Sequence, residues 1–269
     1  MAVVLTYNAP ASLERCLLSI AAQTTPPEAI LVVDNASCPA VDPADLPPGC
    51  PPITLVRSEH NGGRAGGYAL ALEHFLKSDH GHAWVIHHDM RADPECLERL
   101  WVVGAKDPSR TFVFPVSHHL DGTFGAWPSW CGFLVAREII EQVGLPRAEL
   151  FWWADDTEYL QWRIPQAGYP MRVVGDAVMH HDAIDHGEDV PVWKYYYEAR
   201  NMLYVNLYLK KRVGYFPRNL TKLLRRALFR EPEGRWIRLR AVGKGLYDGA
   251  RGRLGSQFPV ESTQEQTSV

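Results

Sequence analysis

The fold is indicated most clearly by the sequence AILVVDN at residues 29–35. Its five apolar residues have the length and the β-branched content of a buried strand, and two polar residues follow directly. The same pattern recurs in VVLTYN at residues 3–8 and in AWVIHHD at residues 83–89. Apolar residues at helical spacing predict helices over residues 11–23 and 68–75. This alternation predicts an α/β fold with a mostly parallel sheet flanked by helices.

Polar residues at the strand ends predict a ligand site. Thr6–Asn8, Asp34–Asn35 and His87–Asp89 each follow a predicted strand. Open α/β sheets bind their ligands at the carboxyl ends of parallel strands, so we expect these three groups to gather at one edge.

The length and composition favour one α/β domain with an appendage. The chain has 269 residues, 46% of them hydrophobic, which is enough to bury a full core. Residues 1–205 are expected to form the α/β domain, and residues 206–253 a basic helical extension. A glycine-rich turn is expected over residues 62–67, and residues 254–269 are expected to be a disordered tail.

Composition also excludes several classes of function. The five cysteines form no close pair, which argues against zinc ribbons and dithiol redox motifs. No signal peptide and no run of about 18 apolar residues is visible, so a cytoplasmic location is expected. Residues 1–209 hold 14 basic and 26 acidic residues, and no nucleic-acid-binding motif is present, so nucleic acid is not expected as a partner.

The basic charge is concentrated near the carboxyl terminus. Residues 210–253 contain 14 Lys or Arg against three acidic residues. The segment 210–230 mixes apolar and cationic residues at helical spacing, so it could lie on the anionic inner face of a membrane. A solvated helix pair that packs on the rest of the protein is the alternative.

The motifs resemble, in their order, those of the family 2 glycosyltransferases. VVLTYN and VVDNAS (residues 32–37) resemble the family's first two strands, and NGGRAGG (residues 61–67) resembles the loop before the metal site. WWADDTEY (residues 152–159) resembles the catalytic-base segment, and YYYEARN (residues 195–201) a later helix. The similarity is greatest to the galactofuranosyltransferase and rhamnosyltransferase branch. It implies the Rossmann-like GT-A fold, a UDP- or dTDP-sugar donor, and a glycan, glycolipid or small-molecule acceptor.

The resemblance implies which residues hold the donor. Asp34 would accept a hydrogen bond from the uracil or thymine ring, although an Asx-turn cap is the alternative. Arg64 could pair with the diphosphate or simply be solvated. Arg200 and Asn201 could also reach the diphosphate, and the alternative for both is a role in packing their helix. The implied nucleotide-sugar contacts are Thr6, Tyr7, Asn8, Asp34, Asn35, Asn61, Gly62, Gly63, Arg64, Gly67 and His88.

The triplet His87-His88-Asp89 departs from the family's acidic triplet, whose outer carboxylates bind Mn²⁺ or Mg²⁺. Alternation along the strand places His87 and Asp89 on one side. His180 matches the family's late histidine, with His181 as an alternative. The implied metal ligands are His87, Asp89 and His180, and imidazole favours Mn²⁺ over Mg²⁺. A metal-independent enzyme and a nucleotide-sugar-binding homologue that has lost activity remain alternatives.

By resemblance, Asp156 is the catalytic base and Asp155 orients the base or the acceptor. Adjacent carboxylates can raise each other's pKa, although they also suit the first turn of a helix. Trp152 and Trp153 precede the pair and, with Trp130, are predicted to contact the apolar face of an acceptor sugar; Trp127 is a weaker candidate. The expected reaction is direct displacement with inversion. A Rossmann-type NAD enzyme is the remaining rival, but TYNAP (residues 6–10) lacks its glycine fingerprint.

Overall fold

The computed structural model describes residues 1–119, 123–125, 128–182, 190–212, 214, 216–230 and 233–257. By its contacts the chain divides into two compact units, Met1–Ala148 with Asp155–Asp185, and Glu149–Ala154 with His186–Val269. Residues 190–205, which the sequence assigned to the first domain, group with the second unit by their contacts. Domain boundaries at residues 205 and 253 stay predictions, and residues 258–269 of the expected tail lie outside the described part.

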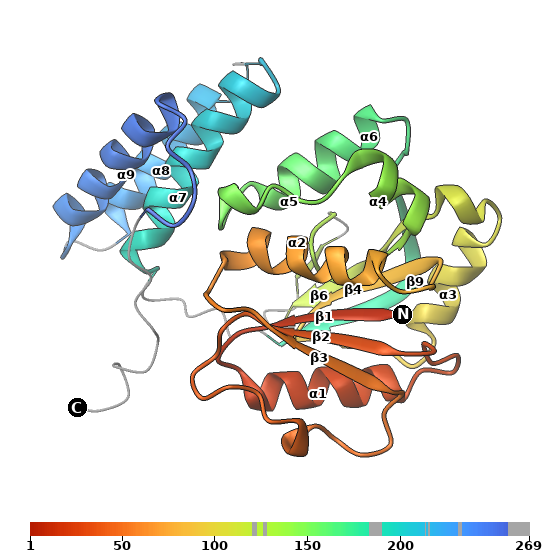
Figure 1. The fold of residues 1–269 in the computed structure, drawn as a ribbon. Helices are drawn as coiled ribbons and strands as arrows, with labels where there is room; N and C mark the ends of the chain where they lie inside the picture. The colour runs from red at the N-terminus through yellow and green to blue at the C-terminus, as the bar shows by residue number, and fades with distance from the viewer. Residues whose placement is uncertain are drawn as a thin grey trace. The chain divides into compact units, whose positions relative to one another are not determined.

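The first unit is built on one mixed sheet (Figure 1). Its strands are β1 (Ala2–Thr6), β2 (Ile30–Asp34), β3 (Ile53–Arg57), β4 (His82–His87), β5 (Met90–Ala92), β6 (Phe112–His119), β7 (Phe124–Gly125), β8 (Phe133–Ala136) and β9 (Arg172–His181). They lie in the order β3-β2-β1-β4-β8-β6-β9-β5, with β7 beside β6. Strands β1 to β4, β6 and β9 run in one direction, and β5, β7 and β8 run opposite. The predicted mostly parallel sheet is confirmed.

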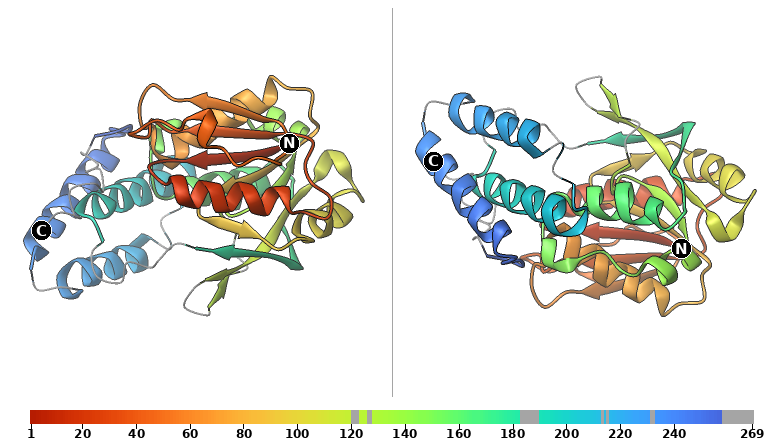
Figure 2. Two further views of the ribbon diagram at one scale, coloured as in Figure 1. Left: turned by 90° about the horizontal axis from the view of Figure 1, so that it is seen from below. Right: turned by 90° about the horizontal axis from the view of Figure 1, so that it is seen from above.

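Helices cover both faces of this sheet. Alternation along β1 directs Val4 toward α1 (Pro10–Ala21) and Leu5 toward α2 (Gly63–Leu76), and each helix adds its own apolar side chains to that core. The views from below and above show α1 on one face and α2 with α4 (Arg137–Val143) on the other (Figure 2). The unit also contains α3 (Cys96–Gly104), α5 (Asp155–Glu158), a π-helical turn (Tyr159–Arg163), α6 (Ile164–Gln166) and short 3₁₀ helices at Pro43–Asp45 and Pro108–Arg110.

The strand register brings the polar groups together. Thr6 pairs with Asp34 across β1 and β2, and Leu5 pairs with His87 across β1 and β4. The carboxyl ends of the three strands therefore lie at one edge, as the sequence predicted.

The expected turn over residues 62–67 is wrong, because α2 already begins at Gly63. One of these glycines allows close packing: a Cβ atom on Gly67 would lie 2.5 Å from Leu5 Cδ1. The glycine-rich sequence suggested a break in the chain, but here Gly67 lets the second turn of a helix approach β1.

We expect Gly67→Ala to lower the free energy of unfolding by about 1–3 kcal/mol, because the added methyl group would overpack the contact with Leu5. Urea unfolding measures the change. Gly66→Ala is the matched control: its Cβ would meet Ala148 Cβ at 3.9 Å, an ordinary contact, and alanine favours the helix. Equal unfolding midpoints for the two variants would contradict the packing argument.

The second unit consists of α7 (Val192–Tyr204), which continues as a π-helical turn (Val205–Leu209), α8 (Phe216–Phe229) and α9 (Arg235–Ala250). Its core contains Tyr195, Tyr196 and Tyr197 from α7 and Leu223 from α8. Helices α7 and α9 pack closely, since a Cβ on Gly245 would collide with the carbonyl oxygen of Tyr196. The predicted helices after residue 210 are confirmed. Within the described residues, every helix is too short or too polar to cross a membrane.

Candidate active site

Asp155 is the buried member of the acidic pair. It is the first residue of α5, and its side chain is 1% exposed. Arg64 of α2 donates to both of its carboxylate oxygens, from Nε at 2.9 Å and from Nη2 at 2.8 Å. Trp130 Nε1 donates to Oδ2 at 2.7 Å. These three charge-assisted hydrogen bonds leave the carboxylate well satisfied, so Asp155 is suited to hold its neighbours in place.

Trp130 lies in the core and not on an accessible surface. Its ring stacks on Tyr68 at 4.1 Å and on Tyr159 at 5.9 Å between centroids, and the residue is 1% exposed. The indole is therefore enclosed within the core. The predicted contact with an acceptor sugar is not possible in this position. Trp130 instead holds Asp155 through the hydrogen bond from its Nε1.

Asp156 is the accessible member of the pair. Its side chain is 21% exposed, and its Oδ2 lies 3.6 Å from Arg64 Nη2. Oδ1 accepts hydrogen bonds from the Thr157 backbone at 2.7 Å and from the Thr157 hydroxyl at 3.3 Å. Burial raises the pKa of Asp156 above its ordinary value, Arg64 opposes this rise, and the negative charge of Asp155 adds to it. A carboxylate with a raised pKa is a better proton acceptor near neutrality.

Arg64 itself is held by the two aspartates. Burial would lower its pKa, but Asp155 and Asp156 together raise it above the ordinary value, so the guanidinium stays charged. Two of its three nitrogens contact Asp155. The solvated alternative is wrong for this residue, and its predicted contact with the diphosphate stays a prediction.

Asp34, at the end of β2, fixes the loop that follows. It accepts hydrogen bonds from the backbone of Ser37 at 2.8 Å and of Val41 at 3.2 Å, and from Arg57 Nη1 at 2.5 Å. Its side chain is 1% exposed. The structure therefore shows the turn cap, and the contact with a nucleotide base stays a prediction.

Asn35 joins β2 to the start of α2. Its Nδ2 donates to Asn61 Oδ1 and to the Gly63 carbonyl, both at 3.0 Å, and its Oδ1 accepts from the Gly62 backbone at 3.1 Å. Asn61 Oδ1 also accepts from the Gly63 backbone at 2.8 Å.

The end of β1 is fixed in the same way. Asn8, with a positive φ of 48°, accepts from the Cys38 backbone at 2.7 Å. Thr6 is buried and Tyr7 is half-buried. The predicted nucleotide contacts on these segments thus lie at one edge of the sheet and brace one another.

Asp89 lies between two imidazoles. His87 Nδ1 is 2.7 Å from Oδ1, and His181 Nε2 is 3.2 Å from Oδ2. Burial would raise the pKa of Asp89, but His87 and His181 hold it well below its usual range. The bond to Asp89 raises the pKa of His181. His88 points elsewhere: its Nδ1 lies 3.2 Å from the Leu5 carbonyl, and burial lowers its pKa to about 3.

His180 does not join this cluster. It follows the other face of β9, where its Nε2 lies 2.8 Å from Asp93 Oδ1. Alternation along β9 directs neighbouring side chains to opposite faces, so His181 takes the place that the sequence gave to His180. Across the described residues, no three or more His, Cys, Asp or Glu side chains are arranged to hold a metal ion.

The carboxylate of Asp89 and the imidazoles beside it are nevertheless suitable ligands for a cation that binds together with a phosphate group. Such cations need only one or two protein carboxylates, since the phosphates supply further oxygen ligands. Asp89 is 21% exposed and has an imidazole beside each oxygen.

The two tryptophans before Asp155 belong to the second unit. Trp152 contacts Trp153 and Trp193, each at 5.0 Å between ring centroids, and Trp153 is 36% exposed. Asn201 Nδ2 lies 2.7 Å from the carbonyls of Leu150 and Trp152 and 2.8 Å from that of Trp153. Trp127 lies outside the described residues.

Two residues of α7, for which the sequence allowed a contact with the diphosphate, make structural contacts instead. Arg200 and Asn201 are fully buried. Arg200 Nη2 donates to the Leu150 carbonyl at 2.8 Å, and its Nε donates to Asn201 Oδ1 at 2.7 Å. The packing alternative is therefore the one that the structure shows.

Sequence reasoning missed Arg57 and Tyr68. Arg57 ends β3 and pairs in register with Asp34, so aligning the predicted strands at their carboxyl ends could have found it. Tyr68, which stacks on Trp130, carried no comparable signal because its partner is 62 residues away.

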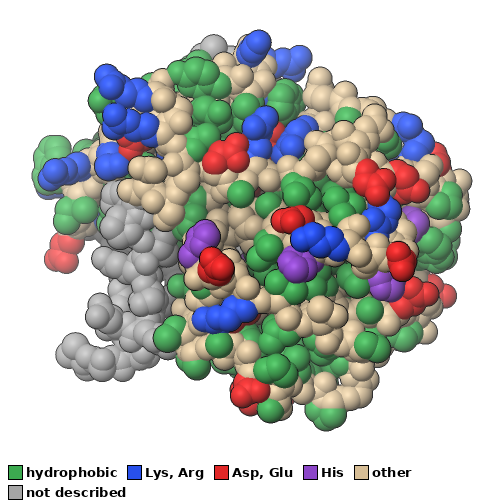
Figure 3. Space-filling model, viewed as in Figure 1, with side chains coloured by type: hydrophobic (Ala, Val, Ile, Leu, Met, Phe, Trp, Pro, Cys, Tyr) green, Lys and Arg blue, Asp and Glu red, His purple; other side chains and the backbone are tan. Residues whose placement is uncertain are grey.

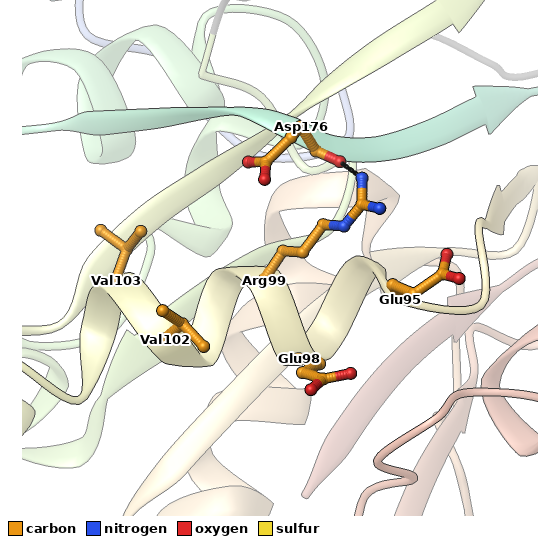
Figure 4. Close-up of a pocket in the computed structure, with 6 residues that line it drawn as sticks. All are labelled: Glu95, Glu98, Arg99, Val102, Val103 and Asp176. Carbon is orange, nitrogen blue, oxygen red and sulfur yellow. Dashed lines mark hydrogen bonds between the residues drawn. The ribbon is translucent and has the colours of Figure 1, made fainter.

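A surface pocket of ≈ 350 Å³ lies elsewhere, beside α3 and the start of β9 (Figure 4). Arg99 points from α3 toward Asp176 and donates to its carbonyl oxygen. None of the predicted site residues lines this pocket. The candidate active site is therefore the strand-end region and not this hollow.

Comparison with known proteins identifies the family of the chain. Residues 1–187 match the family described as Glycosyl transferase family 2. The galactofuranosyltransferase GlfT1 of Mycobacterium tuberculosis is 27% identical over 211 residues, which are 67% of this chain and 69% of that protein.

Solved structures share the fold. Staphylococcus aureus TarS 1–349 in complex with UDP has a TM-score of 0.55 and 15% identity, over 94% of this chain and 87% of that one. A longer TarS structure is matched over 48% of its length, so this chain spans about half of it. The mannosyltransferase PcManGT from Pyrobaculum calidifontis, in complex with GDP-Man and Mn²⁺, has a TM-score of 0.55 and 18% identity, over 93% and 74% of the two chains. Because the family match covers well over half of its residues, the chain belongs to glycosyltransferase family 2 and is a glycosyltransferase with the GT-A fold.

Proposed function

We propose that the protein transfers a sugar from a UDP- or dTDP-sugar to an acceptor hydroxyl, with inversion at the anomeric carbon and Asp156 as the base. One observation carries this proposal. Of two adjacent carboxylates, Asp155 is buried and bound by Arg64 and Trp130, whereas Asp156 is partly exposed and its pKa is raised.

The reaction is a single displacement. The acceptor oxygen attacks the anomeric carbon while Asp156 takes the hydroxyl proton. The bond from that carbon to the diphosphate oxygen breaks, and its electron pair leaves with the nucleoside diphosphate. One displacement inverts the configuration. Arg64 keeps Asp155 and Asp156 in fixed positions, so Asp156 needs little reorganisation during the proton transfer.

Two relatives support a nucleotide-sugar donor. TarS is in complex with UDP and with UDP-GlcNAc, and PcManGT with GDP-Man, in their solved structures. The similarity to GlfT1 favours a galactofuranosyl group as the sugar. The proposed contacts are the strand-end residues of β1 and β2 and the first turn of α2. We also propose a role in cell-wall or surface glycan synthesis, on the basis of the same similarity to GlfT1.

We place a divalent cation at Asp89, with His87 or His181 as the second ligand. PcManGT contains Mn²⁺, and imidazole beside a carboxylate favours Mn²⁺ over Mg²⁺. When bound, the cation would neutralise negative charge on the leaving diphosphate. Replacing carboxylates by histidines removes negative charge from the site, so the affinity in the absence of donor should be low.

The acceptor is proposed to be a glycan, a glycolipid or a small molecule with a free hydroxyl. Trp153 is the proposed sugar contact, because its ring is partly exposed. The neighbouring ring of Trp152 packs beside it.

A panel of donors tests the proposal. The melting temperature of the full chain is measured with UDP-galactofuranose, UDP-galactopyranose, dTDP-rhamnose and GDP-mannose, each with and without Mn²⁺. We expect a UDP- or dTDP-sugar to raise it most, and Mn²⁺ to increase that effect, because a ligand of the folded state stabilises it. NMR of the product should show an inverted anomeric configuration.

The outcomes separate the alternatives. Retained configuration would disprove the single displacement, and no stabilisation by any UDP- or dTDP-sugar would disprove the donor class. Binding without turnover, across a set of glycan and glycolipid acceptors, would favour a homologue that has lost activity. Equal binding with and without Mn²⁺ would favour a metal-independent enzyme.

A further inference from the structure

The outer face of α8 carries a stripe of cations that ends in an aromatic ring. Arg218, Lys222, Arg225 and Phe229 follow one another at intervals of four, three and four residues, which places them on one side of the helix. All four are exposed, and Phe229 is 76% exposed. Leu223 and Ala227, on the opposite side, are buried in the core of the second unit.

Helix α9 begins with a similar mixture. Trp236 is 72% exposed and Ile237 is 62% exposed, and exposed Arg235 and Arg240 lie beside them in the sequence. The two helices contain a single acidic residue, Asp248, which is buried and bonded to Tyr196 and Lys244.

Blue cationic side chains gather over this helical unit, next to exposed green apolar ones, in the space-filling view (Figure 3). We use the name basic–apolar face for the exposed sides of α8 and of the start of α9 taken together, with seven residues: Arg218, Lys222, Arg225, Phe229, Trp236, Ile237 and Arg240.

This combination differs from an ordinary solvated helix face. A basic helix needs no exposed aromatic or branched aliphatic side chains to remain soluble, and three of them within nine residues mark an interaction surface. Tryptophan is enriched where water meets lipid, because one edge of its ring is polar and the rest is apolar. Lys and Arg beside such residues are attracted to anionic headgroups. A surface for double-stranded nucleic acid would need the cations but not the apolar side chains, and a single-stranded one would use aromatic rings but not an exposed isoleucine such as Ile237.

We propose that the basic–apolar face binds the surface of an anionic lipid bilayer. Phe229, Trp236 and Ile237 enter the headgroup region, and Arg218, Lys222, Arg225 and Arg240 contact lipid phosphates. The contact is peripheral. It is independent of the donor and of the proposed function, since every residue involved lies on α8 and α9.

Vesicle co-sedimentation of the full chain tests the proposal. The protein is mixed with vesicles of phosphatidylcholine alone, or of phosphatidylcholine with phosphatidylglycerol. We expect binding to the mixed vesicles, reduced by salt, and much weaker binding to phosphatidylcholine alone. The pair Arg218→Gln and Lys222→Gln should weaken binding to the anionic vesicles by about 25-fold, since each cation contributes about fivefold. The pair Trp236→Ser and Ile237→Ser should weaken binding at every lipid composition.

Matched controls lie in the first unit. Trp101 and Val102 of α3 are 41% and 59% exposed, and Lys106 is exposed nearby. Trp101→Ser with Val102→Ser, and Lys106→Gln, should leave vesicle binding unchanged. Because the substituted residues are exposed, all variants should keep the native melting temperature.

A depth measurement separates insertion from simple charge attraction. Lipids brominated near the headgroup should quench part of the tryptophan fluorescence, and Trp236→Phe should retain binding but lose that part. Absence of binding to anionic vesicles, or equal losses in the control variants, would overturn the proposal. Binding of single- or double-stranded RNA or DNA without binding of vesicles would also overturn it and would identify a nucleic-acid surface instead.

Discussion

Replacing Asp156 by asparagine is expected to lower the rate of sugar transfer by about 10²- to 10⁴-fold while donor binding is retained, since general-base catalysis contributes that much. The amide keeps the size of the side chain and its bond to the Thr157 backbone, but it cannot accept a proton from the acceptor. Release of nucleoside diphosphate in the presence of acceptor measures the rate, and calorimetry measures donor affinity. Asp79→Asn, an exposed aspartate, is the control and should leave the rate unchanged.

The pH profile gives a second readout for the same residue. Because burial and Asp155 raise the pKa of Asp156, kcat/KM should fall as the pH drops through a value above that of an ordinary carboxyl group. The residual activity of Asp156→Asn should lack this acidic limb. A native rate in the variant, or a limb that persists in it, would show that another group is the base.

Replacing Arg64 by methionine is expected to lower the free energy of unfolding by about 3–5 kcal/mol, the cost of breaking a buried ion pair from one side. The Asp155 side chain is 1% exposed, and the substitution leaves its carboxylate with the hydrogen bond from Trp130. Urea unfolding followed by circular dichroism measures the loss. Arg64→Lys keeps the charge but loses the two-point contact, so an intermediate effect is expected.

A double variant tests whether the pair is the cause. Arg64→Met combined with Asp155→Leu removes both charges and should be more stable than Arg64→Met alone. Arg64 also opposes the rise of the Asp156 pKa, so Arg64→Met should move the acidic limb of the pH profile to higher pH. Unchanged stability in Arg64→Met would show that the buried contact contributes little.

Local patterns predicted the strands and their polar ends because the necessary information lies within short stretches. The apolar runs before Thr6, Asp34 and His87 are five or fewer residues long, and parallel pairing then aligns their ends without further specification. The edge of the sheet that carries the site was predictable for this reason.

Contacts between distant parts of the chain were not predictable in this way. Arg64 and Asp155 are 91 residues apart, and nothing near either residue indicates the pairing. The choice between His180 and His181 has a related cause, because both residues end β9 and the face of the strand on which each lies decides which of them meets Asp89. A shift of one residue in such a strand moves each side chain to the other face, and only the pairing of β9 with β5 and β6 fixes its register.

The loop of Trp152 and Trp153 has a thermodynamic link to helix α7. Phe151, Trp153 and Ala154 have φ angles of 63°, 70° and 61°, which cost non-glycine residues about 1–3 kcal/mol each. The Asn201 amide compensates by bridging three carbonyls of the loop. Loop and helix therefore order and melt together, so any molecule that captures the ordered loop also slows hydrogen exchange in α7.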